Sequence, residues 1–257
     1  MILCLDIGNT HINGGVFEKQ NLILQFRKTT RPLASSDEYG LFLKGVLNEN
    51  GISTEKITQI SMCSVVPDSV YSMRSACIKY FGMSPFQLQT GTKTGLKIKY
   101  NNPQDVGADR IANAIAGLDL FPNKNIIIID FGTATTFCII SKEKEYLGGI
   151  ILPGLRISME VLENRTAKLK VVEIKSCDHV IGKTTSESIQ SGLYFGHIGI
   201  IKELKTQIAD EKFQGIIPFT VGTGGFSNLF DDTNLLDTIV PDLALQGLHK
   251  ALILNSQ

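Results

Sequence analysis

Leu3-Cys4-Leu5-Asp6-Ile7-Gly8-Asn9-Thr10 has a counterpart near the middle of the chain, Ile128-Ile129-Asp130-Phe131-Gly132-Thr133-Ala134-Thr135. In each stretch an apolar run ends at an aspartate, followed by any residue, a glycine and small hydroxyl or amide side chains. A second apolar run follows each copy, Val16-Phe17 after the first and residues 137–140 after the second. This pattern is typical of a β-hairpin whose tight turn carries Asp-x-Gly.

Such a turn is suited to binding phosphate. Glycine lets the backbone approach a ligand closely, and N–H groups and short hydroxyls at the bend can donate to anionic oxygens. An aspartate at the strand end would repel phosphate unless a cation bridges the two. A single Asp-x-Gly is most often an ordinary turn. Two copies, each after an apolar run, favour a repeated phosphate-binding unit instead.

The length of 257 residues allows one large domain or two of ordinary size, and the repeat favours two. The Pro and Asn residues in Phe121-Pro122-Asn123-Lys124-Asn125 mark the best boundary, which predicts domains over residues 1–121 and 122–257. Hydrophobic content of 43% and charged content of 19% are typical of globular proteins.

The charge and cysteine content indicate a cytoplasmic protein that binds neither nucleic acid nor membrane. Lys+Arg and Asp+Glu are balanced at 25 each, so there is no overall field to attract nucleic acid or anionic lipid. The five cysteines are scattered and odd in number, which favours reduced thiols. The opening apolar run is interrupted by Asp6, unlike a signal peptide, and no apolar run approaches the ~20 residues needed to span a bilayer.

Two helix starts are readable from the sequence. Ser35, three residues before Glu38, predicts a capping box that opens a helix ending near Gly51. A second helix should begin at Asp105 or Gly107 and run to residue 120, with Gly107-Ala108-Asp109-Arg110 in its first turn. There, Asp109 either complements the helix dipole while Arg110 forms a surface ion pair, or Asp109 accepts a proton while Arg110 binds a substrate carboxylate.

The second half offers fewer signals. Strands are expected near residues 126–130, 135–141 and 145–152, with a short strand-like piece at 168–174. Thr184 or Thr185 is either a helix cap or a ligand contact, and the glycine turn at 222–225 is either a tight strand-to-helix turn or a purine and ribose contact. The four histidines show no metal-ligand spacing, and no Ser/His/Asp or Cys/His set suggests a hydrolase.

The two Asp-x-Gly hairpins, the α/β segment between them and the late glycine turn resemble the actin-like ATPase and sugar-kinase superfamily. Within it, the chain is similar nearly end to end to type III pantothenate kinases. The segments that carry this resemblance are residues 6–10 with Gly15, 107–110, 129–134, 148–154, 166–169 and 190–192. The resemblance implies an α/β fold of two similar actin-like (ribonuclease H-like) domains, each a mixed β-sheet flanked by helices, with an ATP cleft between them.

The resemblance also implies an activity: ATP-dependent phosphorylation of pantothenate to 4′-phosphopantothenate, the first step of coenzyme A biosynthesis, by a homodimer with Asp109 as general base. The implied ATP-binding residues are Asp6, Ile7, Gly8, Asn9, Thr10, His11, Ile12, Asn13 and Thr133. The implied pantothenate-binding residues are Tyr100, Gly107, Ala108, Asp109, Arg110 and Thr185. Asp6 would hold a divalent cation such as Mg²⁺, directly or through water, and Asp130 a monovalent cation, K⁺ or NH₄⁺.

Two other functions are compatible with the same superfamily. One is a kinase for another small molecule, although Arg110 beside the base favours an acidic substrate. The other is a non-catalytic nucleotide-sensing regulator that assists transcription, although an intact Asp109 and the lack of a helix-turn-helix or basic patch argue against it.

The chain departs from the family pattern at Thr184, where asparagine is more usual before the threonine.

Overall fold

The computed structural model describes residues 1–31, 33–166 and 169–256. Ala167 and Lys168, from the family-like segment at 166–169, lie outside the described residues. Contacts divide the chain into two compact units. The first comprises Met1–Leu96, Tyr100–Leu120 and Leu243–Gln257, and the second comprises Lys97–Lys99 and Phe121–Asp242.

In its described residues, the first unit contains a five-stranded sheet and four α-helices. Its elements, in chain order, are β1 (Ile2–Ile7), β2 (His11–Glu18), β3 (Asn21–Thr29), α1 (Ser36–Glu49), β4 (Gln59–Ser64), α2 (Pro67–Phe81), β5 (Phe86–Gln87), α3 (Ala108–Leu120) and α6 (Leu243–Asn255), with 3₁₀ turns at Thr54–Lys56 and Pro103–Asp105. The strand order is β3-β2-β1-β4-β5. β1, β2 and β3 are antiparallel neighbours, whereas β1, β4 and β5 run parallel.

The described part of the second unit contains a six-stranded sheet and two α-helices. Its elements are β6 (Lys97–Ile98), β7 (Ile126–Phe131), β8 (Ala134–Ile140), β9 (Glu145–Pro153), α4 (Leu155–Arg165), α5 (Thr185–Lys212), β10 (Phe219–Thr223), a 3₁₀ helix at Ser227–Thr233 and β11 (Thr238–Ile239). The strand order is β11-β10-β7-β8-β9-β6. β7, β8 and β9 are antiparallel neighbours, whereas β7, β10 and β11 run parallel.

The repeat predicted from the two Asp-x-Gly stretches is therefore present in both sheets. Each has an antiparallel three-strand meander whose first strand, β1 or β7, also pairs with one parallel strand, β4 or β10. That strand pairs in turn with a second parallel strand, β5 or β11. Mixed sheets with helices packed on them agree with the predicted fold class.

The sequence predicts a single division after residue 121, and the observed units depart from it in two segments. β6 pairs with β9, so residues 97–99 belong to the second unit. Helix α6 belongs to the first unit, where it contacts α3, β1 and β4. One of its bonds there joins Ser61 Oγ to the Leu248 carbonyl at 2.9 Å.

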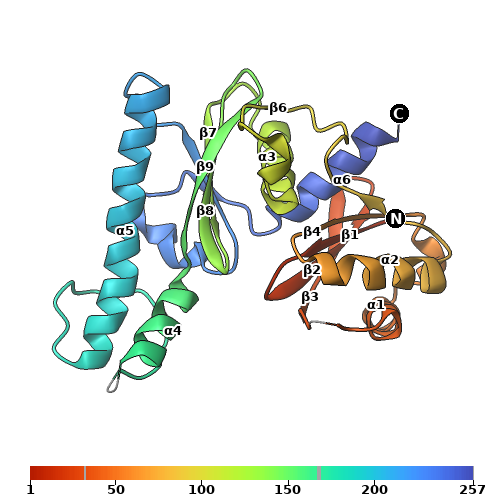
Figure 1. Ribbon diagram of the computed structural model, residues 1–257, viewed down its shortest axis with the longest axis horizontal. Helices are drawn as coiled ribbons and strands as arrows, with labels where there is room; N and C mark the ends of the chain where they lie inside the picture. Colours follow the sequence, from red (N-terminus) through yellow and green to blue (C-terminus); the bar gives the residue numbers. More distant parts are fainter. Residues whose placement is uncertain (32, 167–168, 257) are drawn as a thin grey trace. The chain divides into compact units, whose positions relative to one another are not determined.

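Alternation along β1 assigns its side chains to two faces. Leu3, Leu5 and Ile7 are fully buried in the cluster formed with residues of α1 and α2. Asp6 therefore faces the other side of the sheet, where α3 and α6 pack (Figure 1).

β7 repeats this arrangement in the second unit. Ile127, Ile129 and Phe131 join the buried cluster that includes residues of α4 and α5, so Asp130 lies on the opposite face. Figure 1 shows α5 running beside the sheet that contains β7, β8 and β9.

The strand expected at residues 168–174 is wrong for the described part, because residues 169–174 form no regular strand. This segment bonds to α5 instead: Gln190 Nε2 donates to the Glu173 carbonyl at 2.9 Å. The Glu173 carbonyl is therefore satisfied by a side chain of α5 and not by a neighbouring β-strand. Within the described residues, no helix is long and apolar enough to cross a membrane.

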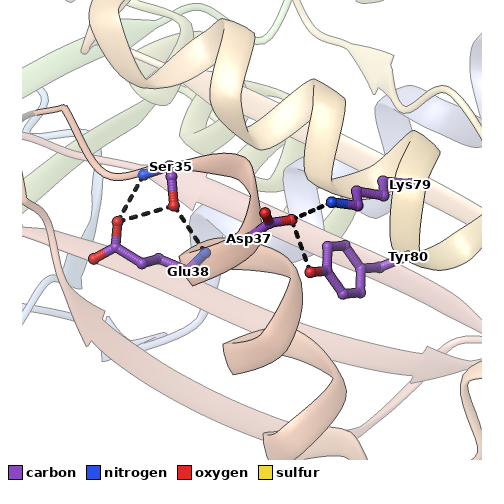
Figure 2. Close-up of polar contacts among 5 residues, drawn as sticks. All are labelled: Ser35, Asp37, Glu38, Lys79 and Tyr80. Atoms are coloured by element: carbon purple, nitrogen blue, oxygen red, sulfur yellow. Dashed lines mark hydrogen bonds and ion pairs between the residues drawn. The ribbon is translucent and has the colours of Figure 1, made fainter.

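The predicted capping box at the start of α1 is confirmed (Figure 2). The backbone N–H of Glu38 donates to Ser35 Oγ at 3.2 Å, and Glu38 Oε2 accepts from the backbone N–H of Ser35 at 2.8 Å. Beside this box, Asp37 Oδ1 accepts from Lys79 Nζ at 2.7 Å and from the Tyr80 hydroxyl at 2.8 Å. These bonds link the first turn of α1 to the last turn of α2.

This link should make stability depend on pH. The hydrogen bonds from Lys79 and then Tyr80 lower the pKa of Asp37 below its ordinary value. The contact therefore stabilises the fold above the ordinary aspartate pKa of about 3.9, and its contribution is lost as pH falls through the lowered pKa. We expect the difference in thermal midpoint between the wild type and Asp37→Asn to narrow between about pH 6 and pH 3. A constant difference across this range would contradict the role of Asp37.

Candidate active site

The first phosphate-type turn joins β1 to β2. Gly8 donates its backbone N–H to the His11 carbonyl at 3.0 Å and closes the turn, leaving Asn9 exposed at the bend. Thr30 ties the turn to the end of β3, since its hydroxyl donates to the Gly8 carbonyl at 2.7 Å and its N–H to the Thr10 carbonyl at 2.9 Å. The bend is therefore held from two sides.

Asp6 sits between two donors from neighbouring strands. Cys63 Sγ lies 3.3 Å from Oδ1, and Asn13 Nδ2 lies 3.4 Å from Oδ2. Burial, and then the negative charge of Asp109, raise the pKa of Asp6 to about 6, while the two donors act in the opposite direction. Burial and the Asp6 charge also raise the pKa of the Cys63 thiol, so the thiol stays protonated and donates. A Cβ atom on Gly107 would lie 3.6 Å from Val65 Cγ1, and Val65 donates its N–H to the Ile7 carbonyl at 3.1 Å. The start of α3, which carries Asp109, therefore lies beside the end of β1, which carries Asp6.

Asp109 lies in the first turn of α3, as the sequence predicts. The helix begins at Ala108, and Gly107 accepts the N–H of Ile111 through its carbonyl at 3.1 Å. Asp109 Oδ1 accepts the N–H of Arg110 at 2.8 Å. Burial raises the pKa of Asp109, the largest influence on it. A carboxylate shifted in this direction is better suited to accept a proton near neutral pH.

Gly107 and Arg110 shape the surroundings of this carboxylate. A Cβ atom on Gly107 would lie 2.5 Å from Asp109 Oδ1, so any larger residue there would displace the side chain of Asp109. Arg110 is buried, with only 6% of its surface exposed. This burial disfavours the simple surface ion pair that the sequence left open for Arg110.

The residues around Asp6 fit a divalent cation. Two carboxylates lie close together there, and Asp6 accepts only from an uncharged thiol and an uncharged amide in the contacts above. Mg²⁺ prefers oxygen ligands and often uses one or two carboxylates together with substrate phosphates. In the described parts of the chain, no group of three or more His, Cys, Asp and Glu residues could hold a metal by itself.

The second turn joins β7 to β8 in the second unit. Gly132 donates its N–H to the Ala134 carbonyl at 3.2 Å, and Thr133 is exposed at the bend. Gly154 packs against this turn and donates its N–H to the Thr133 carbonyl at 3.2 Å. A Cβ atom on Gly154 would lie 2.3 Å from that carbonyl oxygen, so the close approach requires glycine.

The glycine turn at 222–225, absent from the predicted site residues, packs against Asp130. Thr223 of β10 is the parallel partner of Asp130, and Phe226 donates its N–H to the Phe131 carbonyl at 3.2 Å. Gly224 has a φ of +86°, and a Cβ atom on it would lie 2.4 Å from Asp130 Oδ1. The Asp130 carboxylate at this turn offers oxygen ligands of a kind that suits a cation. The sequence signal was the paired glycines directly after a strand.

Ile12 is buried in the core of the first unit, and Tyr100 and Thr185 lie on other elements. Tyr100 is half-buried and belongs to the first unit, just after β6. Thr185 is the exposed first residue of α5 in the second unit. Thr184 is the N-cap of this helix, because its hydroxyl accepts the N–H of Glu187 at 3.2 Å. The capping role is thus confirmed for Thr184.

The fold is that of actin-like sugar kinases. A structure from Sinorhizobium meliloti, of a protein proposed to be a 2-dehydro-3-deoxygalactonokinase, matches with a TM-score of 0.55 at 12% identity, over 98% of this chain and 96% of that one. A Campylobacter jejuni protein, proposed to be a transcriptional activator of the Baf family, matches with a TM-score of 0.64 at 20% identity, over 99% of this chain and 98% of that one.

Sequence similarity narrows this class. The family model for type III pantothenate kinase matches residues 2–207. A type III pantothenate kinase of Legionella pneumophila is 57% identical over 256 residues, covering 100% of both chains. The chain belongs to the type III pantothenate kinase family.

Proposed function

We propose that this chain phosphorylates pantothenate with ATP and yields 4′-phosphopantothenate, the first step of coenzyme A biosynthesis. The observation that carries the proposal is the proximity of Asp109 to Asp6 in a family member with both acids intact. A carboxylate with a raised pKa, next to one suited to a cation, provides a base beside a phosphate turn.

The proposed reaction is a direct phosphoryl transfer. The primary hydroxyl oxygen of pantothenate bonds to the γ-phosphorus of ATP as the bond from that phosphorus to the ADP oxygen breaks, and Asp109 takes the hydroxyl proton. Arg110 pairs with the pantothenate carboxylate and orients the hydroxyl toward Asp109. Phosphoryl transfer depends mainly on positioning and charge neutralisation. The cations that accompany ATP would neutralise the charge on the phosphates.

The proposed binding residues follow the two turns and the α3 start. ATP is held by residues 6–13 and Thr133, and pantothenate by Tyr100, residues 107–110 and Thr185. Asp6 holds Mg²⁺, directly or through water, and Asp130 holds K⁺ or NH₄⁺. The exposed bends at Asn9 and Thr133 and the close backbone packing around Asp130 support this assignment.

We also propose a homodimer that buries an apolar groove of about 390 Å³ between α4 and α5. Ile157, Val161, Leu162 and Leu193 line this groove, and Val161 is 53% exposed. Apolar surface of this kind commonly lies in an interface. Light scattering coupled to size-exclusion chromatography tests the stoichiometry.

One coupled assay separates this function from its alternatives. ADP production is measured in potassium buffer with and without pantothenate. A pantothenate kinase produces ADP only when pantothenate is present. A kinase for another substrate gives no pantothenate-dependent ADP, and a nucleotide-sensing regulator binds ATP without turnover.

Asp130→Ala should weaken the use of ATP and abolish any stimulation by potassium. Removing the carboxylate removes the proposed monovalent-cation ligand, so we expect the KM for ATP to rise by about tenfold, the loss of one charged interaction. The measurement is a potassium titration of initial rates for the wild type and the variant. Asp210→Ala, at an exposed position late in α5, is the control. A variant that keeps the wild-type response to potassium would exclude this role for Asp130.

A further inference from the structure

Asp6 is the central member of a three-strand alignment. In the antiparallel pair of β1 and β2 its partner is Asn13, and in the parallel pair of β1 and β4 its partner is Cys63. Aligned residues on adjacent strands present their side chains to the same face of a sheet. All three side chains therefore lie on the face of the sheet where α3 packs.

The two partners contact different oxygens of the same carboxylate. The Cys63 thiol donates to Oδ1 at 3.3 Å, and the Asn13 amide donates to Oδ2 at 3.4 Å. A donor on each oxygen fixes the rotation of the carboxylate plane, which a single donor would leave free. An ionised carboxylate has about four acceptor sites, so two such bonds leave the other lone pairs for a cation.

The thiol is placed firmly enough to hold this orientation. Cys63 is 0% exposed, and its strand is bonded to β1 along the whole length of β4. The strand continues into Val65, whose N–H donates to the Ile7 carbonyl at 3.1 Å. The pairing of β4 with β1 therefore fixes Cys63 relative to the backbone of Asp6.

We propose that Cys63 is a positioning residue for the reaction, whose thiol orients the Asp6 carboxylate toward the cation that accompanies ATP. Cys63 touches neither nucleotide nor pantothenate in this role and acts only through Asp6. The inference rests on the proposed function for the identity of the nucleotide, but its central test uses nucleotide alone.

The test compares the affinity for a non-hydrolysable ATP analogue, measured by calorimetry in Mg²⁺ and again in EDTA. Cys63→Ala removes the donor and should weaken binding in Mg²⁺ by about tenfold, the loss of one hydrogen bond to a charged group. Cys63→Ser keeps a donor and should restore the affinity to within about twofold of wild type. In EDTA, where Asp6 has no cation to bind, the variants should bind alike.

Two controls separate orientation from packing. Cys77→Ala removes another fully buried thiol, in α2, and should leave the Mg²⁺-dependent affinity unchanged. Cys63→Val fills the space without a donor, so it should behave like Cys63→Ala and replaces it if the smaller side chain prevents folding. Equal losses in Cys63→Ser and Cys63→Ala, or wild-type affinity in Cys63→Val, would overturn the proposal.

Infrared spectroscopy gives a readout that needs no cation. The S–H stretch of Cys63, assigned by its loss in Cys63→Ser, should shift to higher frequency in Asp6→Ala because the thiol loses its acceptor. An unshifted band would also overturn the proposal. If the wild type fails to phosphorylate pantothenate, the proposed function falls, whereas the calorimetric and infrared results still decide the role of Cys63.

Discussion

Asp109→Asn should lower kcat by about 10²- to 10⁴-fold, the range of general-base contributions, and leave the protein folded. Asparagine has nearly the same shape, and its side-chain oxygen can still accept the N–H of Arg110, which lies 2.8 Å from Oδ1 in the wild type. The variant loses the ability to take up the hydroxyl proton. Because one of two neighbouring negative charges is also removed, the pKa of Asp6 should fall toward its ordinary value.

The measurements are kcat and KM for both substrates, with a thermal melt to verify the fold. Asp119→Asn is the matched control, because it makes the same substitution near the far end of α3. Asp119 forms an exposed ion pair with Lys250 at 2.6 Å, and such pairs contribute little to stability. The control should keep wild-type turnover. A folded Asp109→Asn variant with nearly normal kcat would rule out Asp109 as the base.

Local features of the site were predictable from the sequence because local rules determine them. Apolar runs ending in Asp-x-Gly predicted both hairpins, and the positions of Asp6 and Asp130 at the strand ends followed from them. The spacing of Ser35 and Glu38 predicted the start of α1. The first turn of α3 was predicted from the chain break before the helix and from the apolar face along it.

Contacts between distant segments were not predictable in this way. The neighbours of Asp6 across the sheet depend on which strand pairs with β1, and Cys63 lies 57 positions away along the chain. The bond from Ser61 to Leu248, which joins α6 to the first unit, spans 187 positions. Periodicity indicates that α6 has an apolar face but not which sheet that face covers.

The same limit applies to glycines, because a sequence does not say what a side chain would meet. The paired glycines at 224 and 225 were equally compatible with a ligand contact and an ordinary turn. Only the structure shows that a Cβ atom on Gly224 would lie 2.4 Å from Asp130 Oδ1. Gly247, in the middle of α6, gave no sequence signal beyond a lowered helix propensity.

Gly247→Ala should destabilise the protein by about 3 kcal/mol or more, at the upper end of the cost of overpacking. A Cβ atom at this position would lie 1.8 Å from the Ala112 carbonyl oxygen in α3. The obstacle is helix backbone and not the end of a flexible side chain, so α3 and α6 must move apart. Buried Leu245 and Leu248 on α6 would lose contacts as this happens.

The displacement should also reach the reaction, because Ala112 lies one turn of α3 after Asp109. Gly247→Ala should therefore lower kcat as well as the free energy of unfolding, measured by urea denaturation at a temperature where the variant is still folded. Gly45→Ala is the matched control: this exposed glycine of α1 has nothing within 4 Å of the added Cβ atom. Because alanine favours helix, the control should gain up to about 1 kcal/mol. Wild-type stability in Gly247→Ala would mean that α3 and α6 do not pack this closely at Gly247, and that their packing does not position Asp109.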